Sequence, residues 1–374
     1  DGGIICRDEK GDPTGVLLEN AVALAAKHAF EFDKKTVKKL IEGYIDKAVS
    51  LGITSVSDMT PYLSLDLSFP EVYFEMVSNN ELKIRVNAAR NLFEDINTFN
   101  EIRQKADLEG KGLYRVPYMK QFIDGTPANF TGMLLEDYSD NPGEKGKATI
   151  DLDKMAAAIE TATENNISVR LHSCGDRSCR EAINAYENAL KKFPETESRH
   201  MVEHLELVDP NDIPRFGQLG IICSIQPEHL AAGTMKWEEN CYPEKLGPER
   251  ERYTWPFKQL KDNGAVLAGG TDCPVVEGNL FWGMYAGNTR KYYDDIPEGG
   301  WNPQEKLTMP EMIDMFTSGA AYAEHRENEL GTLEAGKLAD ITVVDRNLLE
   351  LEENPDIRDT KVLLTMVDGR VVYS

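Results

Sequence analysis

Cysteines are few in this sequence of 374 residues, and none of the six belongs to a C-x-x-C pair. This scarcity disfavours a disulfide scaffold, a cysteine zinc site and a thioredoxin-like redox motif. We therefore expect a reducing, cytoplasmic setting. The sequence opens at Asp1 without an initiator Met, so a targeting segment upstream of it would not be visible.

Positive charge and long apolar runs are also scarce. Lys and Arg total 41 against 64 Asp and Glu, for a formal net charge of −23. A surface this acidic repels phosphate backbones and anionic lipid headgroups, so neither nucleic acid nor a membrane surface is expected as a partner. No apolar run approaches the roughly 20 residues of a membrane-spanning helix. The absence of a G-x-x-x-x-G-K-S/T loop and of a strand-coupled G-x-G-x-x-G motif disfavours nucleotide binding.

Apolar residues make up 41% of the chain, enough for a sizeable core, and they follow a regular pattern. Short β-branched or apolar runs alternate with amphipathic helical stretches, which is typical of a parallel sheet with crossover helices. Seven runs predict strands: 54–58, 83–89, 116–124, 168–172, 200–206, 221–226 and 265–272. Seven is one short of the eight-stranded (β/α) barrel. The pattern therefore predicts an α/β fold, a TIM-type (β/α)8 barrel that lacks its first strand in this chain.

The predicted barrel, residues 35–325, is flanked by two other segments. Residues 1–34 read as a polar lead-in with a helix from Val16 to Ala29, not as a strand. Residues 326–374 read as short strands with a hairpin turn at Asp368-Gly369. So few strands leave bare edges, so we expect this segment to be part of a β-sandwich completed by strands outside this sequence.

Local signals mark the starts of several helices. Asp151 and Asp176 are predicted to cap the helices that follow them, and Asp209-Pro210 to start a short helix that stops at Gly220. Thr308 and Glu311 have the spacing of a capping box.

Polar side chains gather at the predicted carboxyl ends of the strands, where barrel enzymes hold their chemistry. They are Asp58, Asn87, Arg90, Lys120, Asp124, His172, His204, Glu206, Gln226, His229 and Asp272. Two His, one Lys and one Asp at separate strand ends resemble a metal site. Taken singly, a strand-end His is more often a structural residue, and Asp272 would serve equally to cap the turn at Cys273-Pro274. We interpret His200 as support for the barrel floor, and His28 and His325 as structural or solvated.

Lys120 lies in the middle of an apolar strand, where an unpaired ammonium is costly. One solution is a carboxylate partner, for which Asp124 and Asp272 are candidates. Another is a carbamate formed with carbon dioxide, which has two anionic oxygens able to bridge two cations. A third reading is a barrel lyase or isomerase that uses Lys120 as a Schiff-base nucleophile. Spacing alone does not choose among them.

The motifs make a family resemblance specific. Residues 118–140, 169–187, 199–230, 269–275 and 331–345 resemble, in family order, the amidohydrolase superfamily. Within it they are similar to the YtcJ-like branch that includes N-substituted formamide deformylases. The resemblance implies a metal-dependent hydrolase that cleaves a non-peptide C–N bond of a small amide, formamide or cyclic amide by metal-activated hydroxide. It leaves a homo-oligomer open.

The resemblance also implies roles for single residues. Lys120 matches a lysine that becomes carbamylated and bridges the metals, and His172 and His204 match metal ligands. Asp272 matches an aspartate that contacts metal and carries the catalytic proton. The implied cofactors are one or two divalent ions, expected to be zinc, and carbon dioxide as the lysine carbamate. His229, Arg90 and Asn87 are candidates for binding substrate.

One feature of the family pattern is absent. The family's first strand carries an H-x-H pair that binds the more buried metal, and no H-x-H occurs in these 374 residues. The expectation is that this sequence is the larger C-terminal portion of a longer protein, and the rival is a natural variant that dispenses with the first metal. By itself this portion is expected to bind metal weakly. The alternative to an enzyme is a non-catalytic, incomplete barrel that acts as a binding or assembly module.

Overall fold

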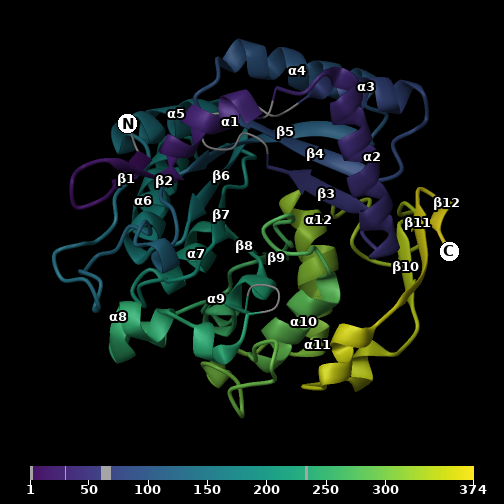
Figure 1. Ribbon diagram of the computed structural model, residues 1–374. Coiled ribbons are helices and arrows are strands. Elements are labelled where there is room, and N and C mark those ends of the chain that lie inside the picture. Colours follow the sequence, from purple (N-terminus) through teal and green to yellow (C-terminus); the bar gives the residue numbers. More distant parts are fainter. Residues whose placement is uncertain (1–2, 30, 60–68, 232–234) are drawn as a thin grey trace. The chain divides into compact units, whose positions relative to one another are not determined.

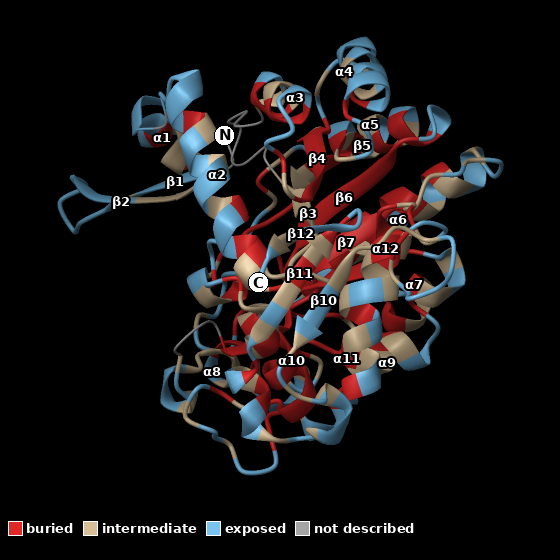
Figure 2. Ribbon diagram, turned by 90° about the vertical axis from the view of Figure 1, so that its right-hand side faces the viewer, coloured by how far each residue is buried: buried red, intermediate tan, exposed pale blue. Residues whose placement is uncertain are grey.

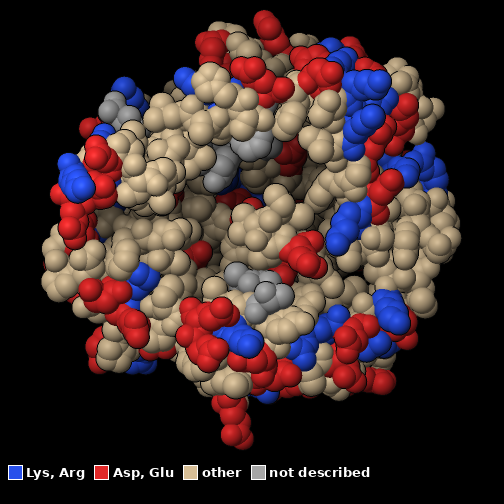
Figure 3. All heavy atoms as spheres, viewed as in Figure 1, with Lys and Arg blue, Asp and Glu red and all other residues tan. Residues whose placement is uncertain are grey.

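The computed structural model describes residues 3–29, 31–59, 69–231 and 235–374 (Figure 1). The chain forms two compact units. The first unit comprises residues 1–42, 57–82 and 86–198, and the second comprises residues 43–56, 83–85 and 199–374. Acidic side chains are spread over the face that Figure 3 shows, in keeping with the net charge of −23.

Parallel strands form the centre of the first unit. Strands β4 (Arg85–Asn91), β5 (Tyr114–Phe122) and β6 (Ser168–Ser173) pair in chain order, with Ala89 opposite Tyr118 and Phe122 opposite His172. Every residue of β6 is buried, as expected for a parallel strand covered on both faces (Figure 2). The helices between and after these strands, with α3 before them, are α3 (Pro70–Ser78), α4 (Ile96–Glu109), η2 (Pro127–Asn129), α5 (Leu152–Glu164) and α6 (Asp176–Lys192).

The predicted cap of α5 is confirmed, and that of α6 is wrong. The Asp151 side chain accepts hydrogen bonds from the backbone N–H groups of Asp153 and Lys154. Helix α6 instead has Gly175 at its N-cap, and Asp176 is its first residue. The Asp176 carboxylate accepts from the backbone of Leu135 as well as from its own helix, so a loop distant in sequence decides its role.

The lead-in is a hairpin, contrary to the prediction of a helix from Val16. Strands β1 (Gly3–Arg7) and β2 (Pro13–Glu19) pair antiparallel, and helix η1 (Asn20–Val22) follows. Helix α1 begins only at Ala23 and ends at Ala29. Gly11 and Gly15 adopt φ of 86° and 90°, conformations that favour a turn and prevent an earlier helix start. Helix α2 spans Lys34–Ser50 and strand β3 spans Ser55–Asp58.

The second unit has its own parallel strands. Strands β7 (Met201–His204), β8 (Ile222–Ile225) and β9 (Leu267–Gly269) pair in chain order, with Val202 opposite Cys223 and Cys223 opposite Leu267. The helices between and after them are α7 (Ile213–Leu219), η3 (Pro227–Ala231), η4 (Trp237–Glu239), α8 (Tyr242–Glu251), α9 (Phe257–Asp262), α10 (Leu280–Thr289), η5 (Pro303–Glu305), α11 (Met309–Asp314), the π-helix η6 (Met315–Gly319) and α12 (Ala320–Ala323). Thr308 and Glu311 form the predicted capping box of α11.

The C-terminal strands form a small antiparallel sheet of β10 (Ile341–Val344), β11 (Val362–Val367) and β12 (Arg370–Tyr373), with helices η7 (Leu348–Glu350) and η8 (Pro355–Asp359) between the first two. Asp368 and Gly369 adopt φ of 50° and 76°, which confirms the predicted hairpin turn. The Thr365 hydroxyl donates to the carbonyl of Val49 at 2.7 Å and anchors the sheet to the end of α2. Among the described residues, no helix is long and apolar enough to cross a membrane.

A buried ion pair joins this sheet to the start of β4. Arg85 donates to both carboxylate oxygens of Asp340 at 2.8 and 2.9 Å, and the two side chains are 3% and 5% exposed. Asp340→Ala leaves the guanidinium buried without this carboxylate, so we expect it to lower the free energy of unfolding by about 3 kcal/mol. Urea denaturation measures the change. Asp345→Ala, which breaks a more exposed ion pair with Arg346 in the same module, is the control and should lower the free energy of unfolding far less.

Candidate metal centre

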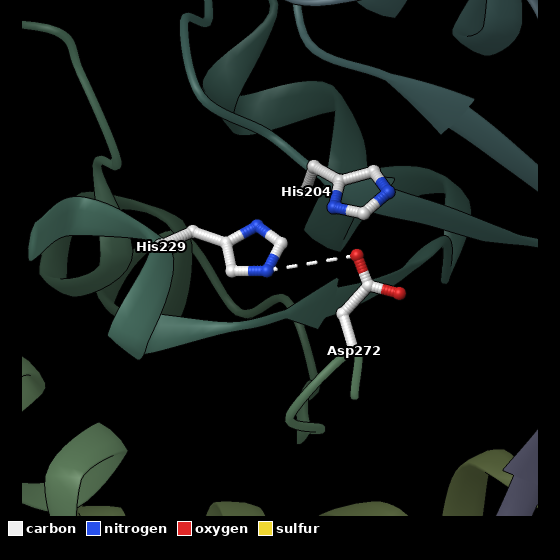
Figure 4. A group of neighbouring side chains, drawn as sticks. All are labelled: His204, His229 and Asp272. Atoms are coloured by element: carbon white, nitrogen blue, oxygen red, sulfur yellow. Dashed lines mark ion pairs between the residues drawn. The ribbon is translucent and has the colours of Figure 1, made fainter. Parts of the chain in front are cut away.

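Three side chains of the second unit converge on one point. His204 ends β7, His229 lies in η3 just after β8, and Asp272 follows β9. One potential ligand atom of each lies within 4.8 Å of the others (Figure 4). The His229 Nε2 and the Asp272 Oδ2 are 3.5 Å apart, and the two imidazole rings are parallel, with centroids separated by 5.7 Å. Two imidazoles and a carboxylate form a donor set that suits zinc and similar divalent ions.

The backbone is strained at two of these three positions. His204 and Asp272 adopt φ of 76° and 58°, and Leu205, directly after His204, adopts 53°. Residues other than glycine rarely take positive φ, and each such residue costs on the order of 1–3 kcal/mol. Strain of this kind persists where surrounding structure holds it, and it gathers at functional sites.

The protonation state of His229 suits metal binding. Burial lowers its pKa below the ordinary value, against the opposing effect of the nearby Asp272 carboxylate. The ring is therefore neutral at neutral pH, and neutral imidazole is the form that binds metal ions. The Asp272 side chain is 34% exposed while that of His229 is 10% exposed, so the carboxylate is the more accessible of the two groups.

Two other predicted ligands, Lys120 and His172, belong to the first unit and are nearly buried, at 2% and 8% exposed. Both contact Phe122. The Lys120 Nζ lies 3.9 Å from the centroid of the Phe122 ring, and the His172 ring centroid lies 4.7 Å from the same centroid. The parallel register of β5 and β6 thus brings both residues to one aromatic ring.

Asp124 was one candidate partner for the Lys120 ammonium. Its carboxylate accepts four hydrogen bonds, from the backbone N–H groups of Met133, Cys174 and Gly175 and from the Ser178 hydroxyl. Burial raises the pKa of Asp124 to about 7, although the four hydrogen bonds favour the charged form. The sequence showed an aspartate four residues after a strand lysine but gave no sign of these donors, which lie on later segments.

The candidates for substrate binding have different surroundings. Arg90 is paired with Glu94, to which its Nε donates at 2.9 Å. Asn87 is 2% exposed, and its side-chain oxygen accepts no hydrogen bond from the described part of the chain. His229 instead joins His204 and Asp272. The sequence placed His229 near the end of β8 but gave no sign that its ring meets His204 and Asp272.

His200, at the start of the segment that leads into β7, is 2% exposed, and burial lowers its pKa to about 3. Because an unfolded histidine titrates near 6.5, the unfolded state takes up this proton first as the pH falls. His200 should therefore destabilise the fold progressively from pH 6.5 towards pH 3, by about 2 kcal/mol at pH 5. Urea denaturation at pH 7 and pH 5 tests this, and His200→Gln should show a smaller difference. An equal pH dependence in both proteins contradicts the assignment.

Comparison with known proteins identifies the family. A sequence model of the amidohydrolase family matches residues 1–373. The whole chain is similar to protein LONG AFTER FAR-RED 3 of Arabidopsis thaliana, with 28% identity over 63% of that protein. It is also similar to the putative amidohydrolase YtcJ of Bacillus subtilis, with 26% identity over 68% of it, and to the N-substituted formamide deformylase of Arthrobacter pascens, with 24% identity over 67% of it. The chain thus spans about two thirds of the length of these relatives.

Solved structures agree with the α/β, TIM-like fold. An uncharacterized metal-dependent hydrolase from Pyrococcus horikoshii superimposes with a TM-score of 0.75 at 23% identity, over 93% of this chain and 67% of that one. A match of the family model over residues 1–373, together with this fold, confirms the resemblance seen in the motifs. The chain belongs to the amidohydrolase family.

Proposed function

We propose that this protein is a metal-dependent hydrolase that cleaves a non-peptide C–N bond in a small amide, formamide or cyclic amide. The observation that carries the proposal is the convergence of His204, His229 and Asp272, with ligand atoms within 4.8 Å of one another. Similarity to an N-substituted formamide deformylase supports the choice of bond. The metal-dependent hydrolase from Pyrococcus horikoshii supports the choice of chemistry.

The three converging side chains fit a divalent cation, which we propose to be zinc. His204 and His229 would supply neutral nitrogens and Asp272 an oxygen. In the first unit, we propose His172 and a carbamylated Lys120 as metal ligands, since carbamylation turns the buried ammonium of Lys120 into an anionic oxygen donor. When bound, such a cation supplies Lewis acidity, which makes water more acidic and a carbonyl carbon more electrophilic.

Asp272 is the group that we propose to move the proton. Its carboxylate is the more exposed of the His229–Asp272 pair and so is able to meet water and substrate. Acting as general base, it takes a proton from the attacking water as the C–O bond forms at the carbonyl carbon. It then delivers that proton to the departing nitrogen as the C–N bond breaks. His229, held neutral by burial, lies beside this carboxylate, with its Nε2 3.5 Å from the Asp272 Oδ2.

Binding of substrate is assigned to the buried amide of Asn87 and to Arg90. The Asn87 side-chain oxygen, which accepts no hydrogen bond from the described residues, suits an N–H group of an amide. Arg90 is already paired with Glu94, so its role would be to hold the end of β4 in place beside Asn87. We propose a cytoplasmic protein and leave the oligomeric state open.

Chelation tests the proposed metal requirement directly. Dialysis of the protein against a chelator should abolish hydrolysis of any active member of a panel of N-alkyl formamides and amides. Addition of zinc should restore that activity. Full activity in metal-free protein contradicts the proposal, and a protein that binds no metal under any condition favours a non-catalytic module.

A further inference from the structure

Asp124 organises two loops of the first unit around one fully buried carboxylate. Its Oδ1 accepts from the backbone N–H of Cys174 at 3.1 Å, and its Oδ2 accepts from Met133 and Gly175 at 2.8 and 2.9 Å. The Ser178 hydroxyl adds a fourth hydrogen bond at 2.7 Å. Asp124 is 0% exposed. The carboxylate thus ties the end of β5 to the turn that follows β6.

The turn after β6 packs closely against the backbone of Met133. A Cβ on Gly175 would lie 2.1 Å from the carbonyl oxygen of Met133, which also accepts hydrogen bonds from the backbone of Arg177 and Ser178. Gly175 therefore sits directly against the Met133 backbone, and the carboxylate of Asp124 bridges the two segments from the side. The position of Cys174, next to Gly175, follows from this arrangement.

The end of β5 and the turn after β6 each contribute one neighbour to the Nε2 edge of the His172 ring. The His172 Nε2 lies 3.3 Å from the Cys174 Sγ and 3.4 Å from the carbonyl oxygen of Gly125, the residue after Asp124. A carbonyl oxygen only accepts hydrogen bonds, and a thiol sulfur accepts them weakly. The thiol also donates weakly, so it fits either tautomer, and the Gly125 carbonyl, which only accepts, is the neighbour that favours a ring with its proton on Nε2. The nitrogen that is left for a metal ion in that tautomer is Nδ1.

We propose that Asp124 is a positioning residue that fixes the tautomer of His172. By holding Cys174 through its backbone and Gly125 by direct connection, it keeps the thiol and the carbonyl at Nε2 and so presents Nδ1 for coordination. The metal-binding part of this inference rests on the proposed function, in which His172 is a ligand. The tautomer itself is a property of the protein without metal.

The decisive experiment combines NMR of the metal-free protein with zinc affinity. Protein with ¹⁵N-labelled histidine, at a pH above the ordinary histidine pKa, reports which ring nitrogen of His172 carries the proton, and His172→Gln assigns the signal. The wild type should show Nε2–H. Asp124→Asn replaces an acceptor by a donor facing backbone N–H groups, so it should give a mixed tautomer and roughly 10- to 100-fold weaker zinc binding.

Two serine variants form a matched pair within the same turn. Ser178→Ala removes one of the four hydrogen bonds to Asp124 and should weaken zinc binding about threefold, with a partial change of tautomer. Ser173→Ala removes a buried hydroxyl that makes no hydrogen bond to the described residues although it adjoins His172, so it should change neither quantity. This pair also decides the question if Asp124→Asn does not fold.

Specific results overturn the inference. Wild-type His172 with its proton on Nδ1 does so, as does a folded Asp124→Asn protein with wild-type tautomer and zinc affinity. If Asp124→Asn does not fold, the inference is overturned when Ser178→Ala and Ser173→Ala show the same His172 tautomer and the same zinc affinity. If His172→Gln binds zinc as tightly as the wild type, His172 is not one of the metal ligands, and that part of the proposed function fails. The His172 tautomer in the other variants still tests the role of Asp124.

Discussion

Asp272→Asn is expected to lower kcat by about 10²- to 10⁴-fold, the usual contribution of a positioned general acid–base group. Asparagine has nearly the same shape but does not accept a proton from water at neutral pH. Because the Asp272 side chain is 34% exposed, the fold should lose little stability. Steady-state kinetics on an amide or formamide that the wild type hydrolyses measures the loss. Circular dichroism and urea denaturation establish that the variant is folded.

Asp314→Asn provides the control for this experiment, because Asp314 is an exposed carboxylate on α11 of the same unit. It should leave kcat and stability unchanged. A folded Asp272→Asn enzyme that retains near-wild-type kcat would exclude Asp272 as the proton carrier. In that case the convergence of the three side chains would have to serve binding alone.

His204→Ala should weaken zinc binding by at least about 100-fold. The variant removes one of the three converging donors, His204, and zinc sites in proteins depend on a nearly complete set of three or four ligands. Competition with a chromogenic chelator measures the affinity, and elemental analysis of the purified protein measures the content. Hydrolytic activity should fall in parallel with metal content.

His28→Ala is the matched substitution for His204→Ala, since His28 is an exposed histidine of α1 far from any strand end in the sequence. It should retain wild-type zinc affinity. Equal zinc affinity in the two variants would show that the cluster of His204, His229 and Asp272 does not hold the metal. Restoration of activity by high zinc in His204→Ala would instead indicate a weakened but intact site.

The local parts of the fold were readable from the sequence. Each of the seven predicted strand segments overlaps an observed strand, because runs of β-branched and apolar residues fit a pleated, buried surface. The Asp151 cap, the capping box at Thr308 and the hairpin at Asp368-Gly369 were also predicted correctly, because each depends on residue types at a short, fixed spacing. In each case the signal and the structure lie within a few residues of each other.

The errors arose where distant segments meet. The lead-in forms a hairpin and not a helix from Val16, and Asp176 bonds to a loop some forty residues earlier instead of capping its helix. The sequence also gave no sign that the short helix η3 brings the His229 ring to Asp272. Helical propensity and strand-end position contain no information about these contacts.

The amino-acid sequence alone determined the family, the order of the strands and the kinds of side chain available at their ends. Each of these depends on residue identity and on spacing along the chain. Only the tertiary structure decided which donors meet, namely His204, His229 and Asp272, and which carboxylate braces the turn beside His172. Convergence of this kind depends on backbone turns at positive φ and on packing between segments some fifty residues apart, and spacing along the chain does not specify either.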